Sequence, residues 1–169
     1  MEADLLNEDS IAAALAGSTF VVHTASPFVL ANPENPDTLI KPAVEGTTAV
    51  MRACKTHGVQ KVAITSSIAA IRSVRRENWP ADNTFDESFW SDTSPENTDI
   101  STYNTSKTLA ERAAWDFREA LPEAERFDLI TLNPALIMGP ANQVNDFASG
   151  DILRGLMTSS GPVNRVKMG

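Results

Sequence analysis

The one tyrosine in the chain stands at the start of a helical pattern, four residues before a lysine. A separation of four residues places the side chains of Tyr103 and Lys107 on one face of a helix, where the ammonium can approach the phenol. A free phenol has a pKa near ~10, and a neighbouring cation favours its ionised form. We therefore expect Tyr103 to exchange protons closer to neutral pH than an isolated tyrosine does.

Two hydroxyl side chains precede this pair. Ser66 and Ser67 follow the run at residues 61–65, which has the β-branched and apolar composition of a buried strand. Each feature alone also fits an ordinary alternative, a solvated helix pair for Tyr103 and Lys107 and a strand-end turn for the serines. Together they supply a hydroxyl to hold a substrate oxygen, a phenol to move a proton and an amine to tune the phenol, which is what reduction of a carbonyl needs.

Short strand-like runs alternate with longer helical patterns along the chain. This alternation predicts an α/β fold with a parallel sheet, whose ligand-binding residues lie at the carboxyl ends of the strands. The polar residues that follow the expected strands fit this arrangement. The expected strands are residues 19–23, 61–65 and 127–132, and the expected helices are residues 11–16, 37–57, 102–121 and 150–157.

Local signals set the expected limits of these elements. Asp9 or Ser10 is predicted to cap the first helix, which Gly17 ends in a left-handed conformation. Pro42 is expected to interrupt the second helix. The polar stretch at residues 72–99 is predicted to be a long surface excursion. Four aromatic side chains are expected to hold this excursion on the domain, namely Trp79, Phe85, Phe89 and Trp90.

The composition bounds the class of protein. The chain has 169 residues, of which 42% are hydrophobic and 21% charged, as expected for one globular domain. Its net charge of −8 disfavours nucleic acid and anionic membranes as partners. The single cysteine, Cys54, cannot form an internal disulfide, and no Cys/His spacing suggests a metal. Without a basic leader or a long apolar run, the sequence predicts a cytoplasmic location.

Several ordered motifs resemble the extended short-chain dehydrogenase/reductases, which are NAD-dependent epimerase/dehydratase-like proteins, and are closest to their dihydroflavonol-4-reductase and cinnamoyl-CoA-reductase branch. The resemblance implies an NAD(P)H-dependent reductase of a ketone or aldehyde, or the reverse oxidation of an alcohol, with NADP as the expected cofactor and NAD as the alternative. Nucleotide-sugar epimerases and dehydratases share the same set of a serine, a tyrosine and a lysine, and such an enzyme remains the alternative function. The motifs are VVHTASPF at 21–28, KPAVEGT at 41–47, ITSS at 64–67, FDESFWSD at 85–92, YNTSK at 103–107 and LNPALIMGP at 132–140.

The resemblance also implies a role for individual residues. Tyr103 would donate the proton, Lys107 would lower its pKa and bind the nicotinamide ribose, and Ser67 would hold the substrate oxygen. Ser66 is the weaker candidate, because the family's serine is the second of the pair. Cofactor contacts are further implied for Asp4 and Leu5 at the adenine, Thr24 and Ser26 along the ribose and phosphates, Thr65 under the nicotinamide, and Pro134, Ile137 and Ser149 around its amide.

One departure from the family is large. The family begins with a strand, a Gly-x-x-Gly-x-x-Gly turn and a helix that binds the pyrophosphate, and this chain contains no such motif. The resemblance therefore implies that residues 1–169 form a single partial Rossmann-like domain without the first three strands, with a small substrate lobe beginning near 141–169. The strand at 19–23 would then have an open edge able to pair with another chain. An inactive fragment is the alternative to an active reductase.

Overall fold

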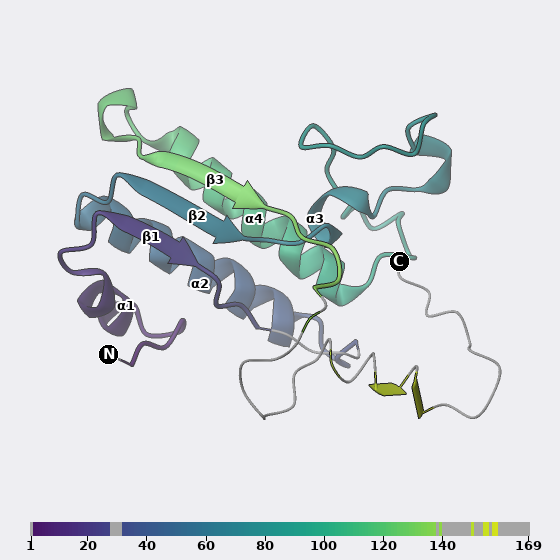
Figure 1. The fold of residues 1–169 in the computed structure, drawn as a ribbon, viewed down its shortest axis with the longest axis horizontal. Coiled ribbons are helices and arrows are strands. Elements are labelled where there is room, and N and C mark those ends of the chain that lie inside the picture. The colour runs from purple at the N-terminus through teal and green to yellow at the C-terminus, as the bar shows by residue number, and fades with distance from the viewer. Residues whose placement is uncertain are drawn as a thin grey trace.

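Three parallel strands form the sheet of the computed structural model, which describes residues 2–27, 32–137, 139, 150, 154–155 and 157–158. The strands β1 (Phe20–His23), β2 (Lys61–Thr65) and β3 (Asp128–Leu132) pair in the order β1-β2-β3 (Figure 1). The predicted parallel sheet is confirmed. The bounds of β2 agree with the sequence prediction, and β1 and β3 each begin one residue later.

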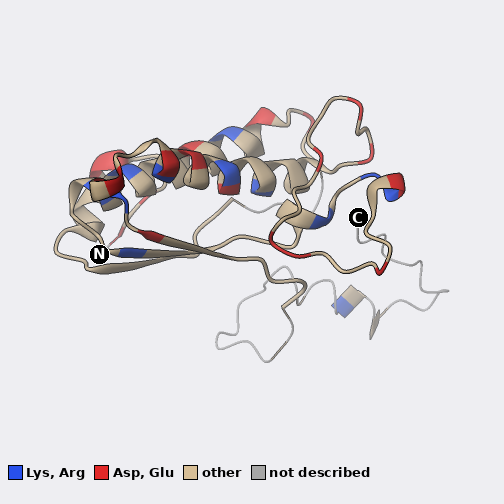
Figure 2. Cartoon of the chain, turned by 90° about the horizontal axis from the view of Figure 1, so that it is seen from above, with Lys and Arg blue, Asp and Glu red and all other residues tan. Residues whose placement is uncertain are grey.

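The two long crossover helices, α2 (Asp37–Thr56) and α4 (Thr102–Ala120), lie on one face of the sheet (Figure 2). The strand order follows the chain order, and connections between parallel strands are almost always right-handed. Both long crossover helices therefore lie on the same side of the sheet. They pack against each other and cover the sheet (Figure 1). The helices are α1 (Glu8–Leu15), α2 (Asp37–Thr56), α3 (Ala69–Arg72) and α4 (Thr102–Ala120), with short 3-10 helices η1 (Arg76–Asn78) and η2 (Glu123–Glu125).

Two expectations about the helices are wrong, one about the cap of α1 and one about a break in α2. The side chain of Asn7, rather than Asp9 or Ser10, caps α1 by accepting a hydrogen bond from the Ser10 backbone N–H. Pro42 does not interrupt α2, which runs through it without a break. A proline near the start of a helix removes a single backbone hydrogen bond, and the rest of α2 is held by its buried face. The prediction for Gly17 is correct, since this residue has a φ of +76° after α1.

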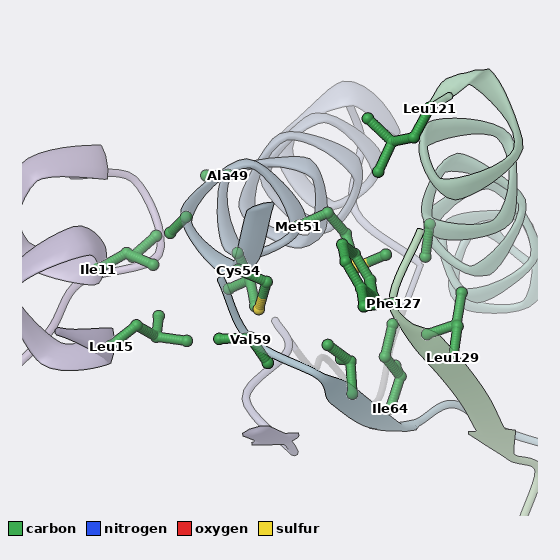
Figure 3. Packing of buried hydrophobic residues seen from close by; sticks show 14 residues of the cluster. Ile11, Leu15, Ala49, Met51, Cys54, Val59, Ile64, Leu121, Phe127 and Leu129 are labelled. Atoms are coloured by element: carbon green, nitrogen blue, oxygen red, sulfur yellow. The ribbon is translucent and has the colours of Figure 1, made fainter. Parts of the chain in front are cut away.

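The hydrophobic core lies between the sheet and α1, α2 and α4. Met51 and Cys54 of α2 are completely buried, and Ile64 of β2 and Phe127 before β3 pack in the same cluster (Figure 3). Alternation along the strands points the other set of side chains away from the helices. This open apolar face consists of Phe20, Val22, Ile130 and Leu132, which are 54% to 70% exposed.

The excursion at residues 72–99 is tied to the domain more firmly than its polar sequence suggests. Ser91 is completely buried, and its Oγ donates to the carbonyl oxygen of Ala69 at 2.6 Å and accepts from the N–H of Ser73 at 2.7 Å. The predicted description as surface is therefore correct only for part of this stretch. Buried polar side chains can pair with backbone groups from a distant segment, which composition does not reveal.

The aromatic side chains in this excursion contact one another and the body of the domain. The rings of Trp79 and Phe85 meet edge to face at 5.7 Å, and those of Phe85 and Phe89 at 5.2 Å. Trp90 lies under the guanidinium of Arg112 on α4, 4.9 Å away. The contact of Trp90 with α4 and that of Trp79 with Arg72 of α3 confirm the prediction for these two residues. Phe85 and Phe89 continue the row of rings from Trp79 within the excursion.

Candidate active site

Helix α4 presents Tyr103 and Lys107 on one face, as their spacing predicts. Ser101 caps the helix by accepting a hydrogen bond from the backbone N–H of Asn104 at 3.1 Å, which fixes Tyr103 in the first turn. The Nζ of Lys107 lies 5.6 Å from the centre of the Tyr103 ring. The Tyr103 phenol is hydrogen-bonded to the side chain of Ser67, which follows β2. The structure thus brings together all three residues expected to be catalytic.

The environment of this triad differs from the expected one in its electrostatics. Burial raises the pKa of Tyr103, and the hydrogen bond with Ser67 opposes this by lowering it. Burial also lowers the pKa of Lys107. The predicted net lowering of the Tyr103 pKa is wrong for this structure, because the effect of burial outweighs that of the hydrogen bond with Ser67.

The two serines at the end of β2 have different partners. The Ser66 hydroxyl points into the interior and donates to Glu111 Oε2 at 2.5 Å. Ser67 bonds with Tyr103, and its Oγ also accepts from the N–H of Ala69 at 3.2 Å. Successive side chains of an extended segment point in opposite directions, which separates the two hydroxyls. Of the two serines, Ser67 is therefore the one whose hydroxyl lies beside the phenol.

Glu111 and Asn133 are site residues that the sequence analysis missed. Glu111 lies one turn beyond Lys107 on α4 and is 5% exposed. Its Oε2 accepts from Asn133 Nδ2 at 2.8 Å, and the same nitrogen lies 3.0 Å from the carbonyl oxygen of Ser67. The available signal was the spacing, since residues 103, 107 and 111 continue one helical stripe.

A small cavity lies at the carboxyl ends of β1 and β2. Ser26, Thr65 and Lys107 line it, so two of the expected cofactor contacts share a site with an expected catalytic residue. His23, at the end of β1, lies in the same cavity and is 8% exposed. Burial, and to a smaller extent the nearby charge of Lys107, lowers the pKa of His23 to about 4, so its imidazole is neutral at physiological pH.

The other expected cofactor residues are spread more widely. Thr24 is exposed directly after β1, and the carbonyl oxygen of Pro134 accepts from the N–H of Ile68 at 3.0 Å, beside the serine pair. Ile137 is 65% exposed. Ser149 lies outside the described residues, as does most of the expected helix at 150–157.

Asp4 and Leu5 do not line this cavity. Asp4 belongs to an exposed cluster before α1, where its carboxylate accepts from the N–H of Leu6 at 2.9 Å. Leu5 packs on α2 at Gly46, where an added Cβ would lie 3.1 Å from the Leu5 Cβ. The glycine therefore allows a close approach between the N-terminal segment and α2, which accounts for Leu5 by packing.

Among the described residues no group of three or more His, Cys, Asp or Glu side chains is arranged to hold a metal ion. No described helix has the length and apolar character needed to cross a membrane.

Comparison with known proteins gives a consistent set of relatives. Residues 1–154 match the family model described as the 3-beta hydroxysteroid dehydrogenase/isomerase family. Tetraketide alpha-pyrone reductase 1 of Arabidopsis thaliana is 38% identical over 143 residues, covering 83% of this chain and 42% of that protein. Cinnamoyl-CoA reductase 2 of Medicago truncatula is 36% identical over 140 residues, covering 83% of this chain and 39% of that protein.

A solved structure has the same arrangement of elements. Yeast methylglyoxal/isovaleraldehyde reductase Gre2, complexed with NADPH, superposes with a TM-score of 0.76 at 29% identity, over 91% of this chain and 49% of the yeast chain. This chain therefore spans about two fifths of the length of the curated relatives it matches and about half of this solved structure.

Proposed function

This chain belongs to the 3-beta hydroxysteroid dehydrogenase/isomerase family, and we propose that it functions as an NADPH-dependent reductase. In this proposal the substrate is a small molecule with a ketone or aldehyde group, or the corresponding alcohol in the reverse direction. The observation that carries the proposal is the hydrogen bond between Ser67 and the Tyr103 phenol, beside the buried ammonium of Lys107. The names of its relatives support a reductase, since they include a cinnamoyl-CoA reductase and a tetraketide alpha-pyrone reductase.

Each member of the triad has a distinct role in this proposal. Tyr103 donates its phenolic proton to the substrate oxygen as negative charge develops there, and Ser67 donates a hydrogen bond to the same oxygen. The raised pKa of Tyr103 keeps the phenol protonated and ready to donate in the reducing direction. Lys107 supplies a positive charge beside the phenolate that is left behind.

The residues present suit the nicotinamide end of the cofactor. NADPH, when bound, supplies the hydride that the carbonyl carbon receives. Lys107 is buried, and no charged partner among the described residues offsets the burial that lowers its pKa. An ammonium in this state can donate to ribose hydroxyls. Ser26 and Thr65 offer further hydroxyls in the same cavity, and we propose that they hold the cofactor with Thr24, Pro134, Ile137 and Ser149.

Asp4 and Leu5 remain proposed adenine contacts on the resemblance alone. Their position before α1 is outside the cavity that Lys107 lines. Replacing Asp4 by Asn should then weaken binding of NADPH without changing the turnover rate at saturating cofactor. Unchanged NADPH affinity would remove Asp4 from the proposed site.

Replacement of Tyr103 by Phe tests the proposed chemistry. The variant keeps the ring but loses the proton, so consumption of NADPH with aromatic and aliphatic aldehydes should fall by about 100-fold or more. Lys107→Met should have a comparable effect. Lys61→Met is the matched control, since Lys61 lies at the opposite end of β2 and pairs with Asp128 at 3.3 Å. Undiminished turnover in Tyr103→Phe would refute the assignment.

The proposal extends to location and association. A cytoplasmic location is supported by the buried, unpaired thiol of Cys54, which suits a reducing compartment.

Self-association is supported by β1, which pairs with one strand among the described residues and carries the exposed side chains of Phe20 and Val22. Sedimentation should then show an association that Val22→Lys abolishes. A chain that is monomeric over the whole accessible concentration range would contradict self-association.

A further inference from the structure

Glu111 is a buried carboxyl group that the proposed chemistry does not use. It lies on α4 with 5% exposure, in line with Tyr103 and Lys107, and lines the same cavity as Lys107. Burying a carboxyl group is costly unless hydrogen bonds compensate. Two donors meet at its Oε2, the hydroxyl of Ser66 at 2.5 Å and the Nδ2 of Asn133 at 2.8 Å. They come from the carboxyl ends of β2 and β3, so Glu111 joins α4 to both strands.

The same network fixes the backbone of Ser67 from three sides. Asn133 Nδ2, which donates to Glu111, also donates to the carbonyl oxygen of Ser67 at 3.0 Å. Ser66, directly before it, is held by Glu111 through its side chain and by the Leu132 carbonyl through its N–H at 2.8 Å. Ile68, directly after it, donates to the Pro134 carbonyl at 3.0 Å. The position of the Ser67 hydroxyl therefore follows from contacts made by its neighbours.

We propose that Glu111 is a positioning residue, whose carboxyl group holds Ser66 and Asn133 so that the Ser67 hydroxyl stays in register with the Tyr103 phenol. Ser67 follows the end of β2 and Tyr103 is on α4. Glu111, also on α4, accepts a hydrogen bond from Ser66, the residue directly before Ser67. Without it, α4 keeps its contacts with α3 and the hydrogen bond from Asn104 to Ser73, but it loses the bond that ties it to the end of β2 at Ser66, so we expect Ser67 to shift relative to Tyr103. A hydrogen bond across that junction weakens steeply with such a shift. This inference rests on the proposed function only for its effect on turnover.

The single tyrosine makes the central contact measurable without substrate or cofactor. Labelling tyrosine with carbon-13 at Cζ gives one NMR signal, whose position at neutral pH reports the hydrogen bond of Tyr103 and whose movement with pH reports its pKa. Ser67→Ala removes a hydrogen bond that lowers this pKa, so the signal should titrate at higher pH. Glu111→Leu, which keeps the volume but accepts no hydrogen bond, should produce the same rise. The double variant should show no further rise, because both changes remove one contact.

Matched variants separate positioning from a general effect of charge. Glu111→Gln should keep the parental signal, because its amide oxygen can accept from both Ser66 and Asn133. Asp116→Asn removes an exposed acid from the same helix and should leave the signal unchanged. If the Tyr103 signal and titration in a folded Glu111→Leu variant match the parent, the proposal is overturned. If Glu111→Leu does not fold, Asn133→Ala provides the test, since it removes the donor that holds Ser67, and an unchanged Tyr103 signal would overturn the proposal equally.

Turnover provides the second measurement. Glu111→Leu should lower kcat with aldehydes by about tenfold or more while KM changes little, because the lost contact acts on the transition state. A chain in which even the parent shows no turnover would count against the proposed function but leave the NMR test of Glu111 intact. The two proposals can therefore fail separately.

Discussion

Acid should destabilise this protein through His23 before it protonates the exposed carboxylates. The imidazole is 8% exposed at the end of β1, in a cavity that Lys107 and Glu111 of α4 also line. Burial first, and then the positive charge of Lys107, lowers its pKa from an ordinary value of 6.5 to about 4. The unfolded chain therefore binds a proton at His23 at a pH where the folded chain does not.

The size and direction of the effect follow from this difference in pKa. Because the folded-state pKa is the lower one, the contribution of His23 to stability is complete above pH 6.5 and is lost as the pH falls toward 4. A shift from 6.5 to about 4, at roughly 1.4 kcal/mol for each unit, corresponds to about 3 kcal/mol. A loss of this size is a large share of the ~5–15 kcal/mol that stabilises a typical domain.

Urea unfolding at a series of pH values from 7 to 4 would measure the effect. His23→Gln cannot titrate in this range, so the difference between parent and variant in the pH dependence of unfolding isolates His23 from all other groups. NMR gives a direct check, because the chain has two histidines and the variant assigns their signals. Equal pH dependence in parent and variant, or a His23 signal that titrates near 6.5, would refute the reasoning.

Other parts of the fold give further predictions. Met51→Ala should lower the free energy of unfolding by about 2–5 kcal/mol, because Met51 is completely buried in the core. Leu6→Ala, at a residue 64% exposed, should change it by less than about 0.5 kcal/mol. Equal effects of the two substitutions in urea titrations would contradict the assignment of Met51 to the core. Burial raises the pKa of Cys54 to about 11, so thiol reagents should modify it only at the rate of unfolding, and rapid modification under native conditions would contradict its burial. Ser91→Ala should cost about 1–3 kcal/mol and speed proteolysis within the excursion, since it leaves the Ser73 N–H without its acceptor; an unchanged cleavage rate would show that this anchor is dispensable.

Local patterns predicted the part of the site that lies on one helix. The spacing of Tyr103 and Lys107 was sufficient to place them together, because the geometry of a helix fixes that relation whatever surrounds it. The strands were also predicted within one residue, since their apolar runs are short and bounded by turn residues. The resemblance to reductases of the cinnamoyl-CoA-reductase branch is confirmed by the relatives.

The rest of the site depends on residues that meet only after folding. A glutamate on a helix is typical of a solvated face, and Glu111 is buried because Ser66 and Asn133, 45 and 22 residues away, reach the same oxygen. The same reason explains Ser91, whose partner Ala69 lies 22 residues before it. The pKa of Tyr103 could not be predicted from sequence for the same reason. The spacing from Lys107 suggested a lowered pKa, whereas the burial that raises it arises from the tertiary structure.

The wide spacing of these contacts has a consequence for folding kinetics. Ser66 and Glu111 are separated by 45 residues, and Ser67 and Asn133 by 66, so the network closes only after both crossovers have docked. Helix formation is rapid and local, but pairing parallel strands over such distances is slow. During refolding, Tyr103 and Lys107 should therefore lie side by side on α4 well before the phenol forms its hydrogen bond with Ser67. The NMR signal of Tyr103 would then follow one of the last steps by which the chain becomes native.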